Sequence, residues 1–515
     1  ARRVARRAAP RTARLAACAE ERLNIVFAGF ECAPFTKTGG LGDVMSSLPR
    51  KLVQKGHRVM TVSPMYYHYD ELHDPCAHVH LEVCGTGVDV EYFHLHRDGV
   101  DLVFVNHPAF RENAGKIYAG STMDVAWRGA LLSQAALEAV WHVHCGGYPY
   151  GTDSLVYVAN DWHTALLPVY LRAFYQDHNN LGYARSVLIV HNGSHQGRLE
   201  PDEVWKFGLP DHHTGAFYLD DPVKGPCCNI LKAGIDYATK VIAVSPAYAW
   251  ELSTDEGGWG LAPTIRSDPA KLSGIVNGID FDIWSPEHDR FLQSDGYQTY
   301  GTCLEGLWTG KQACKAALQR QLGLPEQHDT ITLGFIGRLD QQKGVDFILD
   351  SEEFLMSHNV QVIFLASGTP DLQDRIYDME CRNRDKVRAW IGYSEEMAHR
   401  ITAGCDILMM PSRYEPCGLN QLYAMHYGTV PVVHAVGGLR DTVLHYDAEN
   451  AGTGWTFEHA ATDQFQWALG QAMWTYWEHR DAFMEVALRG MHKDLGWDHA
   501  ASEYEQKFIE AKYAH

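Results

Sequence analysis

The chain has 515 residues, 46% of them hydrophobic and 21% charged, which fits about two to four globular domains and excludes a disordered protein. Its formal net charge of −20 argues against a nucleic-acid binder or a polybasic membrane-surface protein, because both need a positive surface. No run approaches the roughly 18 apolar residues of a membrane span. The twelve cysteines show neither zinc spacing nor a disulfide framework, so we expect a reducing compartment and no metal.

Residues 1–20 differ in charge from the rest of the chain. They contain six arginines and a single acidic residue, Glu20. An Arg-rich and acid-poor leader is typical of an organelle transit peptide, although only Thr12 supplies a hydroxyl. We therefore predict the remnant of a transit peptide, and the alternative is a disordered basic leader.

The first half of the chain alternates short apolar runs with amphipathic stretches, which predicts parallel strands joined by crossover helices. The expected strands are 23–28, 57–62, 102–105, 155–159, 186–190 and 240–244, and one expected helix covers 127–140. The alternation restarts after residue 330. The second set of strands is 331–336, 360–365, 386–391, 406–410 and 430–434.

This pattern predicts an α/β protein with two doubly wound domains. We place the first domain at 21–275 and the second at 276–494. Apolar residues at helical spacing from Trp497 onward predict a terminal amphipathic helix over 495–515. Because open parallel sheets bind ligands where strands run into loops, the loops after these strands are the places to search for chemistry.

The first such loop is KTGGLGDV, residues 37–44. Its glycines let a backbone approach a ligand closely, the N–H groups of a helix start favour anions, and Lys37 adds a positive charge. The motif is neither a P-loop nor a dinucleotide fingerprint, so it does not name a nucleotide. A tight turn with a solvated lysine is an equally good interpretation.

Two loops of the second half carry charged residues. The stretch 334–344 ends a strand and holds Arg338 and Lys343, and two cations in this position suit a diphosphate. The stretch 411–420 precedes a helix, where the N–H groups of Leu419 and Asn420 could bind phosphate oxygens. Glu415 would lie near the group attached to that phosphate, or it could simply compensate the helix dipole.

Two further loops follow strands of the first half. A lone histidine is usually structural, but His191 comes directly after the strand 186–190, which makes a functional role less improbable. Asp161 and Trp162 follow the strand 155–159. Trp162 could stack on a sugar, and a tryptophan of the core is an equally good interpretation.

Seven motifs in this order resemble those of the bacterial glycogen synthase and plant starch synthase family. They are KTGGLGDV, NDWHT, HNxxxQG, GIVNGID, GFxGRLxxQKG, PSRxEPCGLNQLYAM and GGLxDTV, and the resemblance extends from about Asn24 to His515. The segments 400–413 and 431–443 are most similar to plant and algal soluble starch synthases. The sequence of residues 434–443 and that of residues 141–151 resemble class II starch synthases.

The resemblance implies a GT-B fold, in which two Rossmann-like domains face each other across a deep cleft. It implies a retaining transfer of glucose from ADP-glucose to the non-reducing end of an α-1,4-glucan, with no metal and no cofactor. The implied partners are ADP-glucose, ADP and a glucan such as malto-oligosaccharide, amylopectin or glycogen, together with the starch granule or other starch enzymes. The implied compartment is the plastid stroma.

The family also implies roles for individual residues. The residues similar to its catalytic set are Lys37, His191, Arg338, Lys343 and Glu415. Those that match its substrate-binding positions are Gly39, Gly40, Asp43, Asp161, Asn277, Tyr393, Cys417, Gly418, Leu419, Asn420, Gly437 and Gly438. Within this set, Arg338 and Lys343 resemble a diphosphate clamp, Tyr393 an adenine contact, and Asn277 and Asp280 part of an interdomain hinge.

Three rival functions remain at this point. The first is a glucan-binding scaffold that has lost catalysis, the second an α-glucan phosphorylase with pyridoxal phosphate, and the third a synthase that uses UDP-glucose. A disulfide between Cys32 and Cys417 is a further hypothesis, and two small buried residues are the better interpretation of these cysteines.

Overall fold

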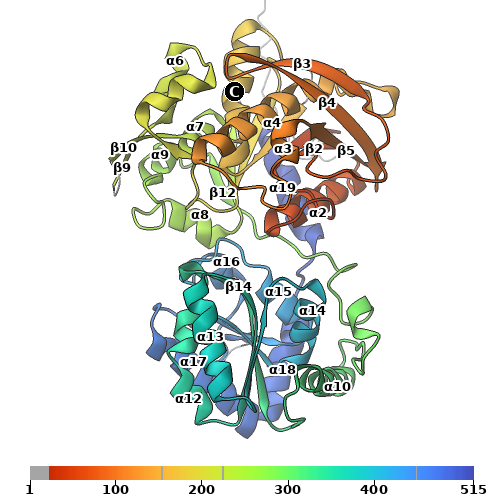
Figure 1. Cartoon of the computed structure of the whole chain (residues 1–515), viewed down its shortest axis with the longest axis vertical. Coiled ribbons are helices and arrows are strands. Elements are labelled where there is room, and N and C mark those ends of the chain that lie inside the picture. Colours follow the sequence, from red (N-terminus) through yellow and green to blue (C-terminus); the bar gives the residue numbers. More distant parts are fainter. Residues whose placement is uncertain (1–21, 152–154, 223–224, 448, 450, 515) are drawn as a thin grey trace, which may run out of the picture. The chain divides into compact units, whose positions relative to one another are not determined.

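The computed structural model describes residues 22–151, 155–222, 225–447, 449 and 451–514, and these divide into two compact units (Figure 1). Unit 1 holds the described residues up to Ile242, together with Leu252–Ser273 and the chain from Ala501 onward. Unit 2 holds Ala243–Glu251 and Gly274–Ala500. The expected transit segment 1–20 lies outside the described residues. Within the described part of the chain, no helix is long and apolar enough to cross a membrane.

Unit 1 is built on a sheet with the strand order β12-β11-β7-β6-β1-β2-β5-β4-β3. Its strands are β1 (Asn24–Ala28), β2 (Arg58–Pro64), β3 (Ala77–Val83), β4 (Thr86–Arg97), β5 (Val100–Asn106), β6 (Leu155–Asn160), β7 (Arg185–Val190), β11 (Lys240–Ala243) and β12 (Leu272–Gly274). Strands β7, β6, β1, β2 and β5 pair in parallel, as predicted. Every residue of β6 is buried, which is typical of a strand covered on both faces.

The edge of this sheet differs from the prediction, because β3, β4 and β5 pair antiparallel. Two tight turns reverse the chain there without a crossover helix. The turn residues Cys84 and Gly85, and then Asp98 and Gly99, all have positive φ, as a two-residue hairpin turn requires. Neither β3 nor β4 was predicted from the sequence, so this antiparallel edge was missed.

The remaining elements of unit 1 are short strands and helices. The small antiparallel sheet contains β8 (Arg198–Leu199), β9 (Tyr218–Asp221) and β10 (Gly225–Asn229). The helices are α2 (Gly40–Gln54), α3 (Pro108–Arg111), α4 (Thr122–His142), α5 (Leu166–Tyr170), α6 (Asp211–Thr214), α7 (Ile230–Tyr237) and α9 (Ala262–Ser267). Helix α4 covers the predicted helix 127–140 and begins with a capping box formed by Ser121 and Asp124.

The last helix, α19 (Trp497–Lys512), packs on unit 1 through its second half. The ring of Phe508 contacts that of Phe27 in β1, with centroids 6.1 Å apart. The carboxylate of Glu505 lies 2.8 Å from His57 Nε2 and 3.0 Å from Lys55 Nζ. The apolar stripe expected from the sequence thus meets the core of unit 1.

Unit 2 has one parallel sheet with the order β15-β14-β13-β16-β17-β18. Its strands are β13 (Ile331–Leu339), β14 (Val360–Gly368), β15 (Val387–Ile391), β16 (Ile407–Met410), β17 (Val430–His434) and β18 (Trp455–Phe457). Its helices are α10 (Leu304–Leu322), α11 (Val345–Leu349), α12 (Glu352–Met356), α13 (Pro370–Arg382), α14 (Glu395–Gly404), α15 (Asn420–His426), α16 (Gly437–Thr442), α17 (Thr462–Glu478) and α18 (Arg480–Met491). Helices α12 and α13 lie on one side of the sheet and α10 and α14 on the other (Figure 1), so this unit is doubly wound.

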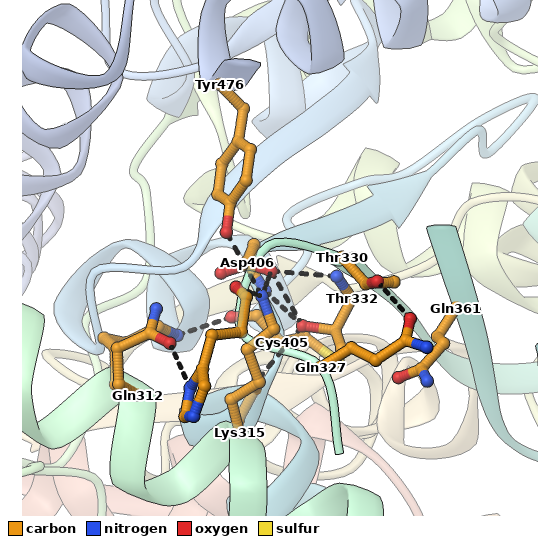
Figure 2. A network of polar contacts seen from close by, with 12 residues as sticks. Gln312, Lys315, Gln327, Thr330, Thr332, Gln361, Cys405, Asp406 and Tyr476 are labelled. Atoms are coloured by element: carbon orange, nitrogen blue, oxygen red, sulfur yellow. Dashed lines mark hydrogen bonds and ion pairs between the residues drawn. The ribbon is translucent and has the colours of Figure 1, made fainter. Parts of the chain in front are cut away.

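A buried polar network lies at the N-terminal ends of β13 and β16 (Figure 2). Lys315 Nζ donates to Asp406 Oδ2 at 2.7 Å and to the hydroxyl of Tyr476 at 3.1 Å. The same carboxylate oxygen accepts from the backbone N–H and the hydroxyl of Thr332, at 2.8 and 2.9 Å. This network ties α10 and α17 to the sheet.

Residues 243–251 belong to unit 2, although the sequence analysis places them in the first domain. This segment includes most of α8 (Pro246–Leu252). The Ser245 hydroxyl donates to the carbonyl of Pro416 at 2.6 Å, and Glu251 accepts from the N–H of Gly437 at 2.7 Å. These bonds join the segment to loops of unit 2 that follow it by more than 150 residues.

Candidate functional site

The loops singled out by sequence lie where strands end. In unit 1 they follow β1, β6 and β7, and in unit 2 they follow β13, β15, β16 and β17. Neighbouring parallel strands end at the same edge of a sheet, so each unit gathers its loops at one edge.

The best defined contact in unit 2 is the ion pair of Lys343 and Glu415. Lys343 Nζ lies 2.6 Å from Glu415 Oε2, and the hydroxyl of Ser412 donates to the same oxygen at 3.0 Å. The lysine side chain is 21% exposed and the glutamate side chain 7%. Because an ammonium group has three donors, Lys343 can hold Glu415 and still donate to a further anion.

Arg338 lies at the end of β13, on the same loop as Lys343. Its guanidinium donates to Gln342 Oε1 at 2.9 Å and lies 3.3 Å from Asp340 Oδ2. The Arg338 side chain is 60% exposed, so most of its donors face solvent. Asp340 also caps the short helix that carries Lys343, by accepting from the Lys343 N–H at 3.1 Å. One aspartate therefore positions both cations.

The backbones of Gly437 and Gly438 pack closely against the loop that carries Glu415. A Cβ on Gly437 would lie 2.2 Å from the Glu415 carbonyl oxygen, and one on Gly438 would lie 2.0 Å from that of Cys417. The Gly438 N–H also donates to the Glu415 carbonyl at 3.0 Å. Larger residues would push this loop away, so both glycines position Glu415 whether or not they touch a substrate.

The other predicted residues of unit 2 surround this loop. Leu419 is the N-cap of α15 and Asn420 its first residue, and the Asn420 side chain is tied to the carbonyl of Ile336 in β13 at 2.9 Å. Gly418 has φ of +70°, which a side chain adopts only with strain. Asn277 and Cys417 are both buried, and burial raises the pKa of the Cys417 thiol to about 12.

Tyr393 lies in the loop between β15 and α14 and is 82% exposed. This ring follows the end of a strand and is largely exposed to solvent, so it does not contribute to the core. It can therefore stack on a planar ligand.

In unit 1 the KTGGLGDV loop is organised by a carboxylate that the sequence analysis missed. Glu31 is buried, and its Oε2 accepts from the N–H groups of Thr38 and Gly39 at 2.6 and 2.9 Å. Lys37 pairs with Asp43 at 2.8 Å. The Gly39 N–H, expected to face a ligand, is therefore held by the protein itself. The signal available in the sequence was an acidic residue three positions after the end of β1.

Asp161 holds the backbone of the His191 loop. Its Oδ1 accepts from the N–H groups of His191 and Asn192, at 2.7 and 3.1 Å. Its backbone has φ of 57° and ψ of −177°, a strained combination for a residue with a side chain. Burial raises the pKa of Asp161 to about 7. Asp161 thus positions the loop, and the side chain is only slightly exposed.

His191 is neutral near pH 7, because burial lowers its pKa to about 3. Its Nε2 lies 2.9 Å from Asn160 Oδ1. A carbonyl oxygen only accepts, so Nε2 carries the proton and Nδ1 is left as an acceptor. The Asn160 amide is fixed in turn by donating to the carbonyl of Ala28 at 3.0 Å.

Trp162 is a core residue, which decides between the two interpretations. It is 8% exposed, its ring centroid lies 4.4 Å from that of His163, and a Cβ on Gly197 would lie 2.4 Å from its ring. Cys32 and Cys417 are both free and buried in the described structure.

Known sequences and structures resemble this chain along nearly its whole length. The sequence model of the starch synthase catalytic domain matches residues 24–267, and that of the group 1 glycosyl transferases matches 319–487. Starch synthase 2, chloroplastic/amyloplastic, of Arabidopsis thaliana is 51% identical over 95% of this chain and 62% of its own length. Soluble starch synthase 2-2, chloroplastic/amyloplastic, of Oryza sativa subsp. japonica is 50% identical over 95% of this chain and 71% of its own length.

A solved structure agrees with these matches. The catalytic domain of starch synthase IV from Arabidopsis thaliana, bound to ADP and acarbose, is 30% identical, covers 96% of this chain and all of its own, and superposes with a TM-score of 0.84. The chain spans 61 to 65% of the length of four curated relatives that match it. The chain therefore belongs to the starch synthase family, with the GT-B fold, as shown by its two Rossmann-like units, by the relative that is 50% identical and covered over 71% of its length, and by this superposition.

Proposed function

We propose that this chain transfers glucose from ADP-glucose to the non-reducing end of an α-1,4-glucan, with retention of the anomeric configuration. The observation that carries the proposal is the pairing of Lys343 with Glu415 beside the exposed guanidinium of Arg338. The relatives' names and the ADP and acarbose bound by the solved starch synthase IV supply the substrate classes.

Arg338 and Lys343 bind the diphosphate of the donor in this proposal. Arg338 presents a planar fork of donors to two phosphate oxygens, and Lys343 contributes a compact charge. As the bond between the anomeric carbon and the phosphate oxygen breaks, negative charge grows on departing ADP, and both cations stabilise it more strongly than in the ground state. Glu415, held by Lys343, orients hydroxyls of the transferred glucose.

The acceptor hydroxyl attacks the anomeric carbon from the side that ADP leaves. The new glycosidic bond forms as the sugar–phosphate bond breaks, and the acceptor proton passes to the departing phosphate oxygen. His191 is neutral near pH 7, because burial lowers its pKa to about 3, and its one ring proton is held by Asn160 Oδ1, so it does not act as the acid. It binds the sugar through the Nδ1 acceptor, while Asp161 and Asn160 hold it in place.

The proposal includes no metal and no organic cofactor, because the positive charge needed at the diphosphate comes from side chains. It also includes a plastid location, since the relatives are named chloroplastic/amyloplastic. Association with the starch granule or with other starch enzymes belongs to the same proposal.

The deciding experiment offers the full chain ADP-[14C]glucose and glycogen, with and without a chelator. We expect label in the polymer, one ADP released per glucose transferred, and a rate that the chelator leaves unchanged. Digestion of the labelled polymer with a β-amylase, which cuts α-1,4 bonds from the non-reducing end, should release the label as maltose. ADP binding without transfer would contradict the proposal and indicate a scaffold.

The donor is tested by competition. Excess unlabelled UDP-glucose should leave incorporation from labelled ADP-glucose nearly unchanged, because the proposed donor site binds the adenosine nucleotide in preference to the uridine nucleotide. Equal competition by the two sugar nucleotides would contradict the assignment of the donor.

A further inference from the structure

Four side chains with metal-binding atoms converge at the edge of the unit 1 sheet, outside the proposed transfer site. They are His94 and His96 of β4, Asp101 of β5, and Cys145 in the turn after α4. His94 Nε2 and His96 Nδ1 each lie 3.0 Å from the same oxygen, Asp101 Oδ1. The ligand atoms of His94, Asp101 and Cys145 all lie within 4.8 Å of one another.

The hairpin explains why these residues meet. His94 and His96 are two positions apart, so they project from the same face of β4. The tight turn at Asp98 and Gly99 sets a register that pairs His96 directly with Asp101. Cys145 lies 44 residues after Asp101 and belongs to the 141–151 segment, which the proposed transfer reaction does not use.

The surroundings hold the carboxylate in one orientation. Asp101 Oδ2, the other oxygen, accepts from the Tyr150 hydroxyl at 2.8 Å and lies 4.0 Å from Arg58 Nε. Arg58 also donates to the carbonyl of Cys145 at 2.8 Å, which fixes the turn that carries the thiol. Oδ1 is thereby directed at the imidazoles, and secondary contacts of this kind are typical of carboxylates that ligate metals.

We infer that His94, His96, Asp101 and Cys145 form a structural site for a divalent metal ion of the Zn²⁺ type. The set offers two imidazole nitrogens, one carboxylate oxygen and one sulfur. Each is a type of atom that binds Zn²⁺, and four of them suit its tetrahedral geometry. On binding, each imidazole changes tautomer: the ring nitrogen that faces Oδ1 loses its proton, the other ring nitrogen takes one up from solvent, and the ion binds the nitrogen that faces Oδ1. The Cys145 thiol loses its proton to solvent and binds as the thiolate.

The exposure of the four residues shows a site that is buried on one side and open to solvent on the other. Cys145 and Asp101 are 1% and 6% exposed, and the side chains of His94 and His96 are 20% and 61% exposed. The ion would therefore enter past His96. A second cluster, Asp177 with His212 and His213, fits less well, because Arg172 already lies 2.7 Å from the Asp177 carboxylate.

The test uses the full chain, stripped of metal with a chelator and titrated with Co²⁺ alone, in the absence of substrates. We expect one Co²⁺ per chain, visible absorption typical of tetrahedral cobalt, and a near-ultraviolet band from thiolate-to-cobalt charge transfer. Zn²⁺ should abolish both bands and raise the unfolding temperature relative to the chelated protein. This readout is independent of glucosyl transfer, so its failure would leave the proposed function untouched.

Variants assign the ligands. Cys145→Ser should remove the charge-transfer band and weaken Co²⁺ binding at least tenfold, and His94→Ala should weaken it similarly. Matched controls are His80→Ala, which removes an exposed His–Asp pair of the neighbouring β3–β4 hairpin, and Cys84→Ser, which removes a half-buried thiol. Both controls should bind Co²⁺ as the parent chain does.

Three results would overturn the inference. They are no Co²⁺ binding, binding without a thiolate band, and a thiolate band that survives in Cys145→Ser. Circular dichroism of the metal-free Cys145→Ser chain shows whether it is folded. If it is not, the rise of the unfolding temperature of the parent chain with Zn²⁺, and its loss in His94→Ala, decide the question.

Discussion

Unit 2 contains two lysine–carboxylate pairs at opposite ends of the same sheet, and they differ in what surrounds them. The first pair, Lys315 and Asp406, lies at the N-terminal strand ends. Its side chains are 1% and 8% exposed, and Lys315 Nζ lies 2.7 Å from Asp406 Oδ2. Lys343–Glu415, at the C-terminal strand ends, is just as short at 2.6 Å, but its lysine is 21% exposed. Distance alone does not separate a structural ion pair from a functional one.

The difference lies in how many other partners each pair has. The Asp406 carboxylate also accepts two bonds from Thr332, and Lys315 donates in addition to Tyr476 and to the His328 carbonyl (Figure 2). The loop of Lys343, in contrast, also carries the Arg338 guanidinium, which is 60% exposed. A saturated pair stabilises the fold, whereas a pair beside exposed donors can bind an anion.

The largest effect on stability is expected at the saturated pair. Lys315→Met leaves the Asp406 charge buried without its cation, which should lower the free energy of unfolding of unit 2 by about 3–5 kcal/mol. Urea unfolding followed by tryptophan fluorescence measures this change. The matched control is Arg375→Met, which breaks an exposed pair with Asp350 and should cost no more than about 1 kcal/mol. Equal losses in the two variants would contradict the comparison.

The largest effect on activity is expected at the open pair. Lys343→Ala should lower the rate of glucose transfer about 100- to 1000-fold, because a cation that stabilises the leaving group is lost. The variant also leaves Glu415, which is 7% exposed, without its cation, so some loss of stability is expected, and activity is compared at a temperature at which both chains are folded. Arg382→Ala, which removes an exposed cation on α13, serves as the control and should transfer at the parent rate. A variant at Lys343 with near-normal turnover would exclude its role in the clamp.

The smallest of the three effects is expected at Gly438, which packs against the Glu415 loop. Gly438→Ala places a Cβ 2.0 Å from the Cys417 carbonyl oxygen and should destabilise unit 2 by about 1–3 kcal/mol, while it lowers activity by displacing Glu415. Gly470→Ala in α17 is the control, because its Cβ would meet only Phe354 at 3.7 Å. Alanine is also the better helix former, so this variant should be as stable as the parent chain or slightly more so. Unchanged activity in Gly438→Ala would show that the loop tolerates displacement.

The parallel strands and the loops after them could be predicted from sequence, because both depend on patterns a few residues long. The strand 430–434 was predicted with the bounds that β17 has, and the terminal helix differs from α19 only at its ends. The two edge hairpins of β3, β4 and β5 were missed. Asp98-Gly99 is a dipeptide typical of a two-residue hairpin turn and was an available signal, whereas Cys84 does not mark a turn by type.

The hydrogen-bond and ion-pair partners of these residues could not be predicted, because the partners lie far apart in sequence. Lys343 and Glu415 are separated by 72 positions, and Arg58 and the Cys145 carbonyl by 87. The sequence by itself determined the family, the two α/β units and the positions of the charged loops. Only the tertiary structure decided that Glu31 holds the Gly39 N–H, that Trp162 is buried, and that two similar ion pairs differ, because burial and hydrogen-bond partners arise from packing between distant segments.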